Sequence, residues 1–398
     1  MYKLVITKRD SFVFSVVFNE EGKPVELYAE PEAVPSRLGN IYLGHVMNVV
    51  PNIEAAFIEI EGGCMCYCSL KEKTSYLFGP HANQTRLCQG DYVLVQVQRE
   101  GIKTKQPSVS GKLQFAGKYL VLLHDTRGVK ISHKITKPED VNRLKTLFSN
   151  CENENYGLIV RTNALQVSDF QLKAEEERLV SLYRTVCETG VHKQRGSLVY
   201  QSFPWYIDLL RDLPEQELSE VVTDDAEIFS RLTEYTTLFQ PEDVQKLRLY
   251  TDETLSLGAL YSLQKIKEEA LSKTVWLKSG ASIVIEPTET LTVIDVNTGK
   301  AISGKKTGDE MFYKINEEAA RACMQQIRLR NLSGMILIDF INMEKEVYNE
   351  RLLQLLRELA TEDRIPVTVV DMTGLKLVEL TRKKVKKPLH ELLPKSIS

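Results

Sequence analysis

Two aspartates, each at the end of a short apolar run, are the residues of this chain best suited to chemistry. Asp295 follows the run LTVI, and Asp339 follows MILI. One strongly helical stretch separates them, so a strand–helix–strand unit would set two parallel strands side by side. Both carboxylates would then lie at the carboxyl ends of the strands, the edge of an α/β sheet where ligands bind.

An ionised aspartate in that position needs a cation or hydrogen-bond donors, because otherwise its pKa rises until it is neutral. Asn297 lies two residues after Asp295, on the same side of an extended chain, and offers a neutral oxygen. Two carboxylates and an amide oxygen suit a hard cation such as Mg²⁺, with Asp295 and Asp339 as its ligands. The alternative is structural: Asp295 in a turn of the type Asp-x-Asn-Thr-Gly, and Asp339 as a helix cap.

The whole chain has the composition of a soluble globular protein with two to four domains. It has 398 residues, of which 43% are hydrophobic and 26% charged. No apolar run approaches the roughly 20 residues that cross a bilayer, and the start, MYKLVITKRD, lacks a signal-peptide layout. We therefore expect a cytoplasmic protein, with its seven cysteines as reduced thiols.

The net charge of −3 means that nucleic-acid binding must rest on local patches. One segment near the end is rich in cations, and it is interpreted either as an RNA contact or as a solvated basic tail. Its members are Lys376, Arg382, Lys383, Lys384, Lys386 and Lys387.

The pattern of the remaining chain predicts several kinds of element. The first 30 residues alternate like a β-hairpin, and short strands with glycine turns from residue 37 to about 118 indicate a small closed barrel. Residues 119–211 have mixed α+β character. Strand-like and helical segments continue to about residue 272, followed by the α/β unit that carries the aspartates.

The predicted barrel carries aromatic and basic residues of the kind that bind single-stranded nucleic acid. Phe57 and Tyr67 fall on successive strands, and Lys103, Lys105 and Lys112 fall on the adjoining loop and strand. Barrels of this type stack bases on aromatic rings while lysines follow the backbone. The alternative is that Phe57 belongs to the core and Tyr67 is half-buried.

Another strand, YGLIVRTNA, ends in Arg161 and Thr162. The arginine fork and the threonine hydroxyl suit a terminal phosphate. An ordinary salt bridge at the end of a strand is the alternative.

Together these segments resemble the ribonuclease E/G family of bacterial endoribonucleases over nearly the whole chain. GNIYLGHVMNVVPNIEAAFIEI resembles the start of the family's S1-type OB domain, and YGLIVRTNA resembles its 5′-phosphate sensor. VWLKSGASIVIEPTETLTVIDVNTGK and NEEAARACMQQIRLRNLSGMILIDFINM resemble its catalytic half.

The resemblance implies a multidomain α/β and α+β architecture. It implies an RNase H-like domain (1–36 and 212–272) with two insertions, an S1-type OB domain (37–118) and a 5′-sensor region (119–211), and then a DNase I-like catalytic domain (273–398). It also implies a Mg²⁺-dependent endoribonuclease of single-stranded RNA, acting in RNA processing and decay, that prefers a 5′-monophosphate.

The resemblance assigns roles to the same residues. The catalytic residues would be Asp295, Asn297 and Asp339, with the two aspartates holding Mg²⁺. Phe57, Tyr67, Lys105 and Lys112 would contact RNA, and Arg161 and Thr162 would hold the 5′-phosphate; the family usually has Phe where this chain has Tyr67.

Three departures from the family pattern qualify these expectations. No CPxC motif is found up to the final PLHELLPKSIS, which leaves a homodimer open and argues against a zinc-linked tetramer. The segment Thr373-Gly374-Leu375-Lys376 exchanges the family's glycine and basic residue, and Asn342 replaces the second aspartate of DFIDM. The alternatives are a family member that binds RNA without cutting it, and a scaffold that recruits a partner through its basic end.

Overall fold

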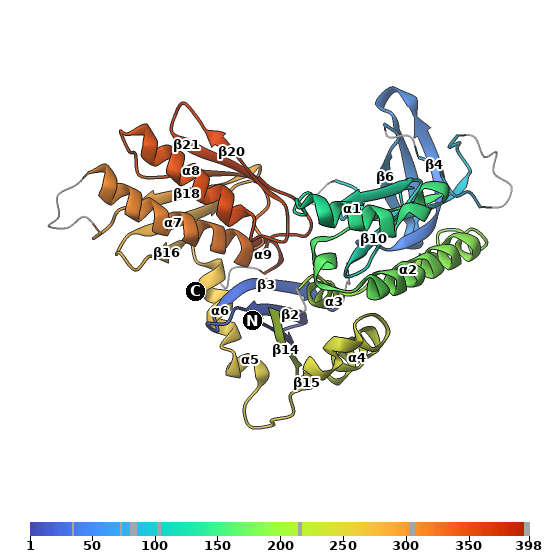
Figure 1. Ribbon diagram of the computed structural model, residues 1–398, viewed down its shortest axis with the longest axis horizontal. Helices are drawn as coiled ribbons and strands as arrows, with labels where there is room; N and C mark the ends of the chain where they lie inside the picture. Colours follow the sequence, from blue (N-terminus) through green and yellow to red (C-terminus); the bar gives the residue numbers. More distant parts are fainter. Residues whose placement is uncertain are drawn as a thin grey trace. The chain divides into compact units, whose positions relative to one another are not determined.

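The computed structural model describes residues 1–33, 36–71, 74–79, 86–101, 105–213, 217–301 and 308–393, without the side chains of 152 and 153. The chain forms two compact units (Figure 1). The first unit combines Met1–Val34 with Glu215–Ser398, and the second is Pro35–Pro214.

The first sheet of the first unit joins the start of the chain to its middle. Its strand order is β15-β14-β1-β2-β3, with β1 antiparallel to β2 and parallel to β14. Asp10 and Ser11, both with positive φ, form the two-residue turn of the predicted hairpin. The strands are β1 (Tyr2–Arg9), β2 (Phe12–Phe18), β3 (Pro24–Pro31), β14 (Leu218–Thr223) and β15 (Leu247–Leu249). The accompanying helices are α4 (Ala226–Phe239), α5 (Leu257–Leu260), α6 (Leu263–Leu271) and α9 (Leu389–Leu392).

The second sheet of this unit carries the two aspartates. Its order is β16-β17-β18-β19-β21-β20, and β18 and β19 are parallel, as the strand–helix–strand pattern predicts. The strands are β16 (Thr274–Trp276), β17 (Ser282–Pro287), β18 (Leu291–Asn297), β19 (Gly334–Asp339), β20 (Val367–Met372) and β21 (Leu377–Arg382). The helices α7 (Asp309–Leu329) and α8 (Glu346–Ala360) lie against one face of this sheet (Figure 1).

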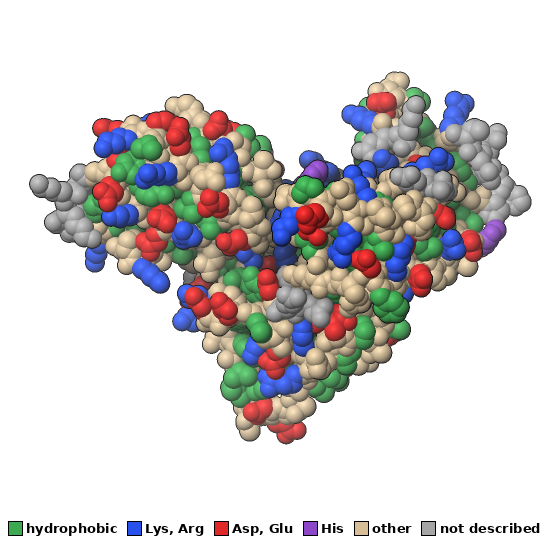
Figure 2. Space-filling model, viewed as in Figure 1, with side chains coloured by type: hydrophobic (Ala, Val, Ile, Leu, Met, Phe, Trp, Pro, Cys, Tyr) green, Lys and Arg blue, Asp and Glu red, His purple; other side chains and the backbone are tan. Residues whose placement is uncertain are grey.

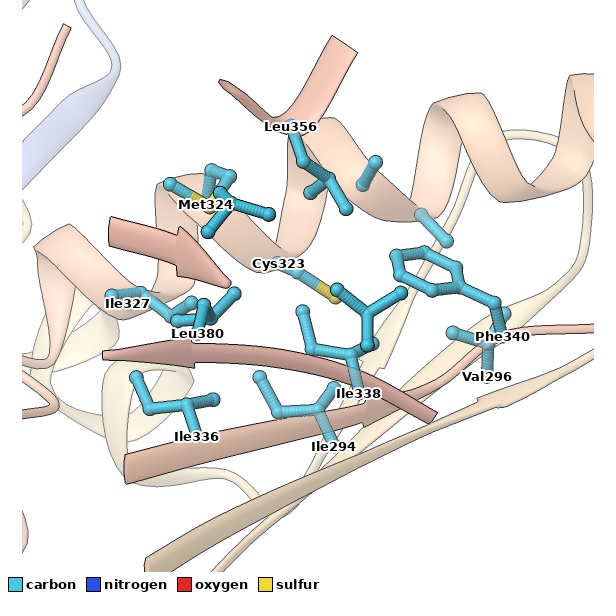
Figure 3. Close-up of a cluster of buried hydrophobic side chains, with 14 of the residues drawn as sticks. Ile294, Val296, Cys323, Met324, Ile327, Ile336, Ile338, Phe340, Leu356 and Leu380 are labelled. Carbon is cyan, nitrogen blue, oxygen red and sulfur yellow. The ribbon is translucent and has the colours of Figure 1, made fainter. Parts of the chain in front are cut away.

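The alternation of side chains in β18 and β19 explains how this sheet is built. Ile294 and Ile338 point toward α7 and α8 and are fully buried, together with Cys323 of α7 and Leu356 of α8 (Figure 3). Each buried side chain of this size stabilises the fold by roughly 1.5–3 kcal/mol. The intervening residues of the strands, Asp295 and Asp339 among them, point to the opposite face, which we call the open face.

An ion cluster at Glu26 connects the two sheets of the first unit. Glu26 of β3 is 3% exposed and pairs with Arg328 of α7 at 3.5 Å and with Arg364. The hydroxyl of Tyr28 donates to the same carboxylate at 3.1 Å. Burial alone would raise the pKa of Glu26, but the two guanidinium charges and these hydrogen bonds outweigh burial and lower it.

The second unit begins with the closed barrel that the sequence predicts. Five strands run in the order β4-β5-β6-β8-β7, and β7 pairs again with β4. Cys66 and Cys68 point into the core of the barrel, as small buried residues. The strands are β4 (Ile41–Val50), β5 (Ala55–Ile60), β6 (Cys64–Ser69), β7 (Tyr92–Arg99) and β8 (Ser108–Ser110), with β13 (Leu198–Tyr200) added to β4.

A four-stranded sheet completes the second unit. Its order is β11-β12-β10-β9, with β11 and β12 parallel. The strands are β9 (Gln114–Ala116), β10 (Leu120–His124), β11 (Gly128–Ile131) and β12 (Tyr156–Val160), and the helices are α1 (Pro138–Leu147), α2 (Asp169–Gly190) and α3 (Trp205–Asp212). Glu175 of α2, which is 4% exposed, accepts three backbone N–H groups from Lys118 to Leu120 at 2.8–2.9 Å. This carboxylate joins the long helix to the sheet.

The basic segment near the end of the chain is only partly solvated, which corrects the interpretation of it as a free tail. Arg382 is 2% exposed, and its guanidinium donates to Asp363 at 2.7 Å and to Asn331 at 2.8 Å. Lys386 pairs with Glu30 at 3.6 Å, whereas Lys383 is exposed. Buried charges require such partners, so Arg382 is structural and does not contact RNA.

Two further expectations concern the chain as a whole. All seven cysteines are free thiols. Within the described ranges, no helix is both long and apolar enough to cross a membrane.

Candidate active site

Asp295 and Asp339, which we call the carboxylate pair, lie directly opposite each other on neighbouring parallel strands. Strands paired in this way are about 4.8 Å apart, and both side chains point to the open face. Asp295 is half-buried and Asp339 is exposed. The pairing therefore brings together two carboxylates that are far apart in the sequence.

The structural alternatives for these two aspartates are wrong. Asp295 lies within β18, and the turn begins three residues later, where the N–H of Ala301 donates to the carbonyl of Thr298 at 2.9 Å. Asp339 ends β19, while the residue that caps α8 is Lys345. Neither carboxylate is needed to end or begin the element beside it.

Asn297 holds one member of the carboxylate pair. Its amide nitrogen donates to Oδ2 of Asp295 at 2.7 Å, and it is the last, exposed residue of β18. The hydrogen bond restricts the Asp295 side chain and leaves its second oxygen, Oδ1, to other partners. The sequence predicted that Asp295 and Asn297 share a face, but it did not predict the hydrogen bond between them.

The donor set of the pair fits a magnesium ion. Like charges directly opposite each other on a sheet repel, and a cation removes that repulsion. Among the described residues there is no cluster of three or more His, Cys, Asp or Glu side chains placed to hold a metal. A two-carboxylate site suits Mg²⁺ in particular, because Mg²⁺ keeps several waters and is held by one or two carboxylates plus substrate phosphates.

Two lysines lie next to this edge of the sheet, in the turns that flank β17 and β18. Lys278 and Lys300 are both exposed, and the N–H of Lys300 donates to the carbonyl of Gly280 at 3.2 Å. Gly299 has φ +50° and approaches Gly280 so closely that a Cβ would meet the carbonyl oxygen at 2.5 Å. The close approach joins the two turns that carry Lys278 and Lys300.

Lys376 approaches the same edge from the turn between β20 and β21. It has φ +62°, and its ammonium donates to the carbonyl of Met343 at 3.0 Å. The next residue, Leu377, pairs with Asp339. Although Gly and Lys are exchanged relative to the family pattern in Thr373–Lys376, this turn therefore still places a cation at the aspartate end of the sheet. Asn342, which is exposed, lies on the segment after Asp339.

The two aromatic residues of the barrel lie side by side. Phe57 of β5 pairs directly with Tyr67 of β6, and their ring centroids are 6.2 Å apart at 75°. Both rings point away from the barrel core and are half-buried. Phe57 therefore does not belong to the barrel core, contrary to the structural alternative, whereas Tyr67 is half-buried, as that alternative expected.

The segments that carry the predicted lysines border Tyr67. The N–H of Tyr67 donates to the carbonyl of Pro107 at 2.8 Å, and Tyr67 pairs with Ser108 of β8. Lys105, which is exposed, precedes this contact by two residues, and the half-buried Lys112 follows β8. Lys103 lies outside the described residues.

Arg161 and Thr162 follow β12 in the second unit. Nη1 of Arg161 donates to the carbonyl of Gly117 at 2.9 Å and pairs with Asp212 at 2.8 Å. The hydroxyl of Thr162 lies 3.4 Å from that of Ser132. Arg161 therefore forms the salt bridge that the sequence offered as an alternative. Its partner, Asp212, was not identified from the sequence because it lies on α3, far along the chain.

Charge on the drawn face of the molecule is mixed. Lysine and arginine side chains are interspersed with aspartate and glutamate side chains on both units (Figure 2). Contacts with a polyanion must therefore come from local groups such as those described above.

The family model and the individual relatives that match this chain point to the same family. The model of the Ribonuclease E/G family matches residues 114–385. The chain is 30% identical to Ribonuclease G of Escherichia coli over 388 residues, which cover 95% of this chain and 79% of the relative. It is 31% identical to Ribonuclease G of Haemophilus influenzae (94% and 78%) and 31% identical to Ribonuclease E of Synechocystis sp. (89% and 53%).

Proposed function

The chain belongs to the ribonuclease E/G family, and we propose from this premise that it is a Mg²⁺-dependent endoribonuclease of single-stranded RNA in RNA processing and decay. The observation that carries the proposal is the carboxylate pair, in which Asp295 lies opposite Asp339 on the open face. Family membership supports the class of reaction, and the paired register supports the location.

The protein groups at this edge have separable tasks. Asp295 and Asp339 would hold Mg²⁺, which when bound activates water and stabilises charge on phosphate oxygens. Asn297 keeps the Asp295 carboxylate oriented through its 2.7 Å hydrogen bond. Lys376, held at Met343, adds positive charge near a site where a phosphodiester becomes more negative.

The second unit supplies groups suited to hold the substrate. Phe57 and Tyr67 would stack bases, while Lys105 and Lys112 contact the backbone. Arg161, with Thr162, would bind a 5′-monophosphate. The Nη1 atom of Arg161 already contacts Gly117 and Asp212, and Nε and Nη2 form the edge suited to a phosphate.

The domain assignments belong to the same proposal. The sheet of β1–β3, β14 and β15 would be the RNase H-like domain, the barrel the S1-type OB domain, and the β16–β21 sheet the DNase I-like domain. A cytoplasmic location and a homodimer are further parts of the proposal.

The test is cleavage of a 5′-monophosphorylated, A/U-rich single-stranded RNA, with Mg²⁺ and with EDTA. We expect internal cuts with Mg²⁺ only, and loss of cutting in Asp295→Asn with RNA affinity retained. A matched control is Glu350→Gln, an exposed carboxylate on α8 that lies on the covered side of the sheet. Normal cutting by Asp295→Asn would refute the site, and intact binding without any cutting by the wild type would favour an RNA-binding member that has lost turnover.

The scaffold alternative requires a basic end that is available to a partner. Arg382 is buried and does not belong to such a surface, whereas Lys383 and Lys384 are exposed. Leu389 and Leu393 pack in the core beside β2 and β3. Removing residues 382–398 would therefore damage the fold of the first unit, and partner binding cannot be tested by that deletion.

A further inference from the structure

Trp276 is the largest apolar side chain exposed on the catalytic sheet. It is 73% exposed at the end of β16, the edge strand of the sheet. Tryptophan is on average among the highly buried residues. Packing of the fold does not account for its position, because the neighbouring Val275, and not Trp276, packs against the core.

The strand register places Trp276 on the open face, in line with the proposed active site. Trp276 pairs with Ser282, and Ser282 pairs with Asn297, so all three side chains point to the same face. Two strand spacings, or about 10 Å, separate Trp276 from Asn297. A nucleotide next to the phosphodiester at the carboxylate pair is within reach of the indole ring.

Two exposed lysines lie in the turns beside Trp276. Lys278 follows it by two residues and is exposed, and Lys300 is brought to the same turn by its bond to Gly280. Glu318 of α7 accepts the N–H groups of Lys278 at 2.7 Å and Ser279 at 3.3 Å, which fixes the turn against the helix. An aromatic ring with cations beside it is the arrangement that binds single strands without strict sequence preference.

We propose that Trp276 is a stacking platform for the base of a nucleotide adjoining the phosphodiester that is cut, with Lys278 and Lys300 facing the neighbouring phosphates. The ligand is a single-stranded RNA segment, and purines are expected to bind better than pyrimidines because they offer a larger stacking surface. This inference rests on the proposed function, since it takes the carboxylate pair as the place of cleavage.

Intrinsic fluorescence tests the contact directly, because the chain has only two tryptophans. Trp205→Phe leaves Trp276 as the sole indole, and Trp276→Phe leaves Trp205 at the start of α3 in the other unit. We expect saturable quenching by an A-rich single-stranded RNA, in EDTA, for Trp205→Phe and not for Trp276→Phe. Unchanged emission of Trp276 at saturating RNA would overturn the proposal. A change in Trp276 emission that occurs without RNA and parallels dimerisation, as measured by sedimentation, would also overturn the proposal. It would show that a second copy of the chain covers the open face.

Cleavage kinetics separate this inference from the proposed function. Trp276→Ala should lower kcat/KM about 5- to 100-fold, the range expected for loss of one stacked base. Trp276→Phe should retain most of the activity, and Val370→Ala, at an exposed apolar residue of the far strand β20, should change little. The loss should disappear with an RNA that carries an abasic nucleotide at one position next to the cut.

The cleavage results distinguish failure of the proposed function from failure of the proposal for Trp276. A wild type that does not cleave refutes the proposed function. A wild type that cleaves, with Trp276→Ala equally fast on intact RNA, refutes the platform alone.

Discussion

Replacing Arg161 with methionine should remove the preference for a 5′-monophosphate while leaving cleavage of 5′-hydroxyl RNA nearly unchanged. The Arg161 side chain is 26% exposed, and its guanidinium contacts the carbonyl of Gly117 at 2.9 Å and the carboxylate of Asp212 at 2.8 Å. Both contacts use Nη1, and in the proposed function the edge formed by Nε and Nη2 binds the 5′-phosphate. Methionine keeps the apolar stem and removes that edge.

The size of the effect follows from these contacts. A hydrogen bond to a charged group contributes about 1.5–3 kcal/mol. Asp212 already neutralises part of the Arg161 charge, and partial exposure screens the remainder, so we take the lower end, about 1.5–2 kcal/mol. This corresponds to a roughly 10- to 30-fold smaller ratio of the two kcat/KM values.

The assay compares two RNAs that differ only in the 5′ group, each cleaved by wild type and Arg161→Met. Any loss of stability affects both substrates equally and cancels in the ratio. Arg143→Met is the control, because Arg143 also forms an ion pair in the second unit, with Asp169 at 3.0 Å. A ratio for Arg161→Met equal to that of the wild type would show that this arginine does not sense the 5′ end.

Three further outcomes are expected. Asp339→Asn should abolish cleavage, measured as a loss of at least about 100-fold in kcat, and retain RNA affinity; a normal rate would reject the pair. Glu26→Gln should lower stability by about 3 kcal/mol near neutral pH. Because the folded pKa of Glu26 is lowered, its contribution to stability is present above roughly pH 4.3 and is lost as the pH falls through the folded pKa. The variant should therefore lose less stability in acid than the wild type. Free energies of unfolding in urea that change with pH in the same way for both proteins would contradict this. Phe57→Ala should weaken RNA binding about 5- to 100-fold, and unchanged affinity by filter binding would remove Phe57 from the RNA path.

The sequence was informative where a pattern is local. The apolar runs before Asp295 and Asp339 predicted two adjacent parallel strands, because a buried parallel strand has a continuous apolar run. The alternation in residues 37–118 predicted the barrel for a similar reason, since period-2 patterning reports one buried and one exposed side. The roles of these residues remain predictions.

The sequence was uninformative where a charged group is paired through the fold. Arg382 stands in a run of lysines and has the pattern of a solvated end, but its partners Asp363 and Asn331 come from other turns of the first unit. Arg161 likewise pairs with Asp212, which lies about 50 residues further along the chain on α3. Periodicity reports which face of an element is buried, and it does not report which distant charge meets it.

The pairing of β13 with β4 has a consequence for how the protein folds during synthesis. Leu198 pairs with Tyr42, and Ser202 bonds to Leu38, so the two ends of the second unit are fastened together. In the first unit, in contrast, β1 pairs with β14, which begins about 210 residues after β1 ends. If the second unit folds first on the ribosome, it shortens that loop roughly sevenfold and lowers the entropic cost of joining β1 to β14 by about 2 kcal/mol. Folding of the second unit would thereby bring β1 and β14, the early and late parts of the first unit, close to each other.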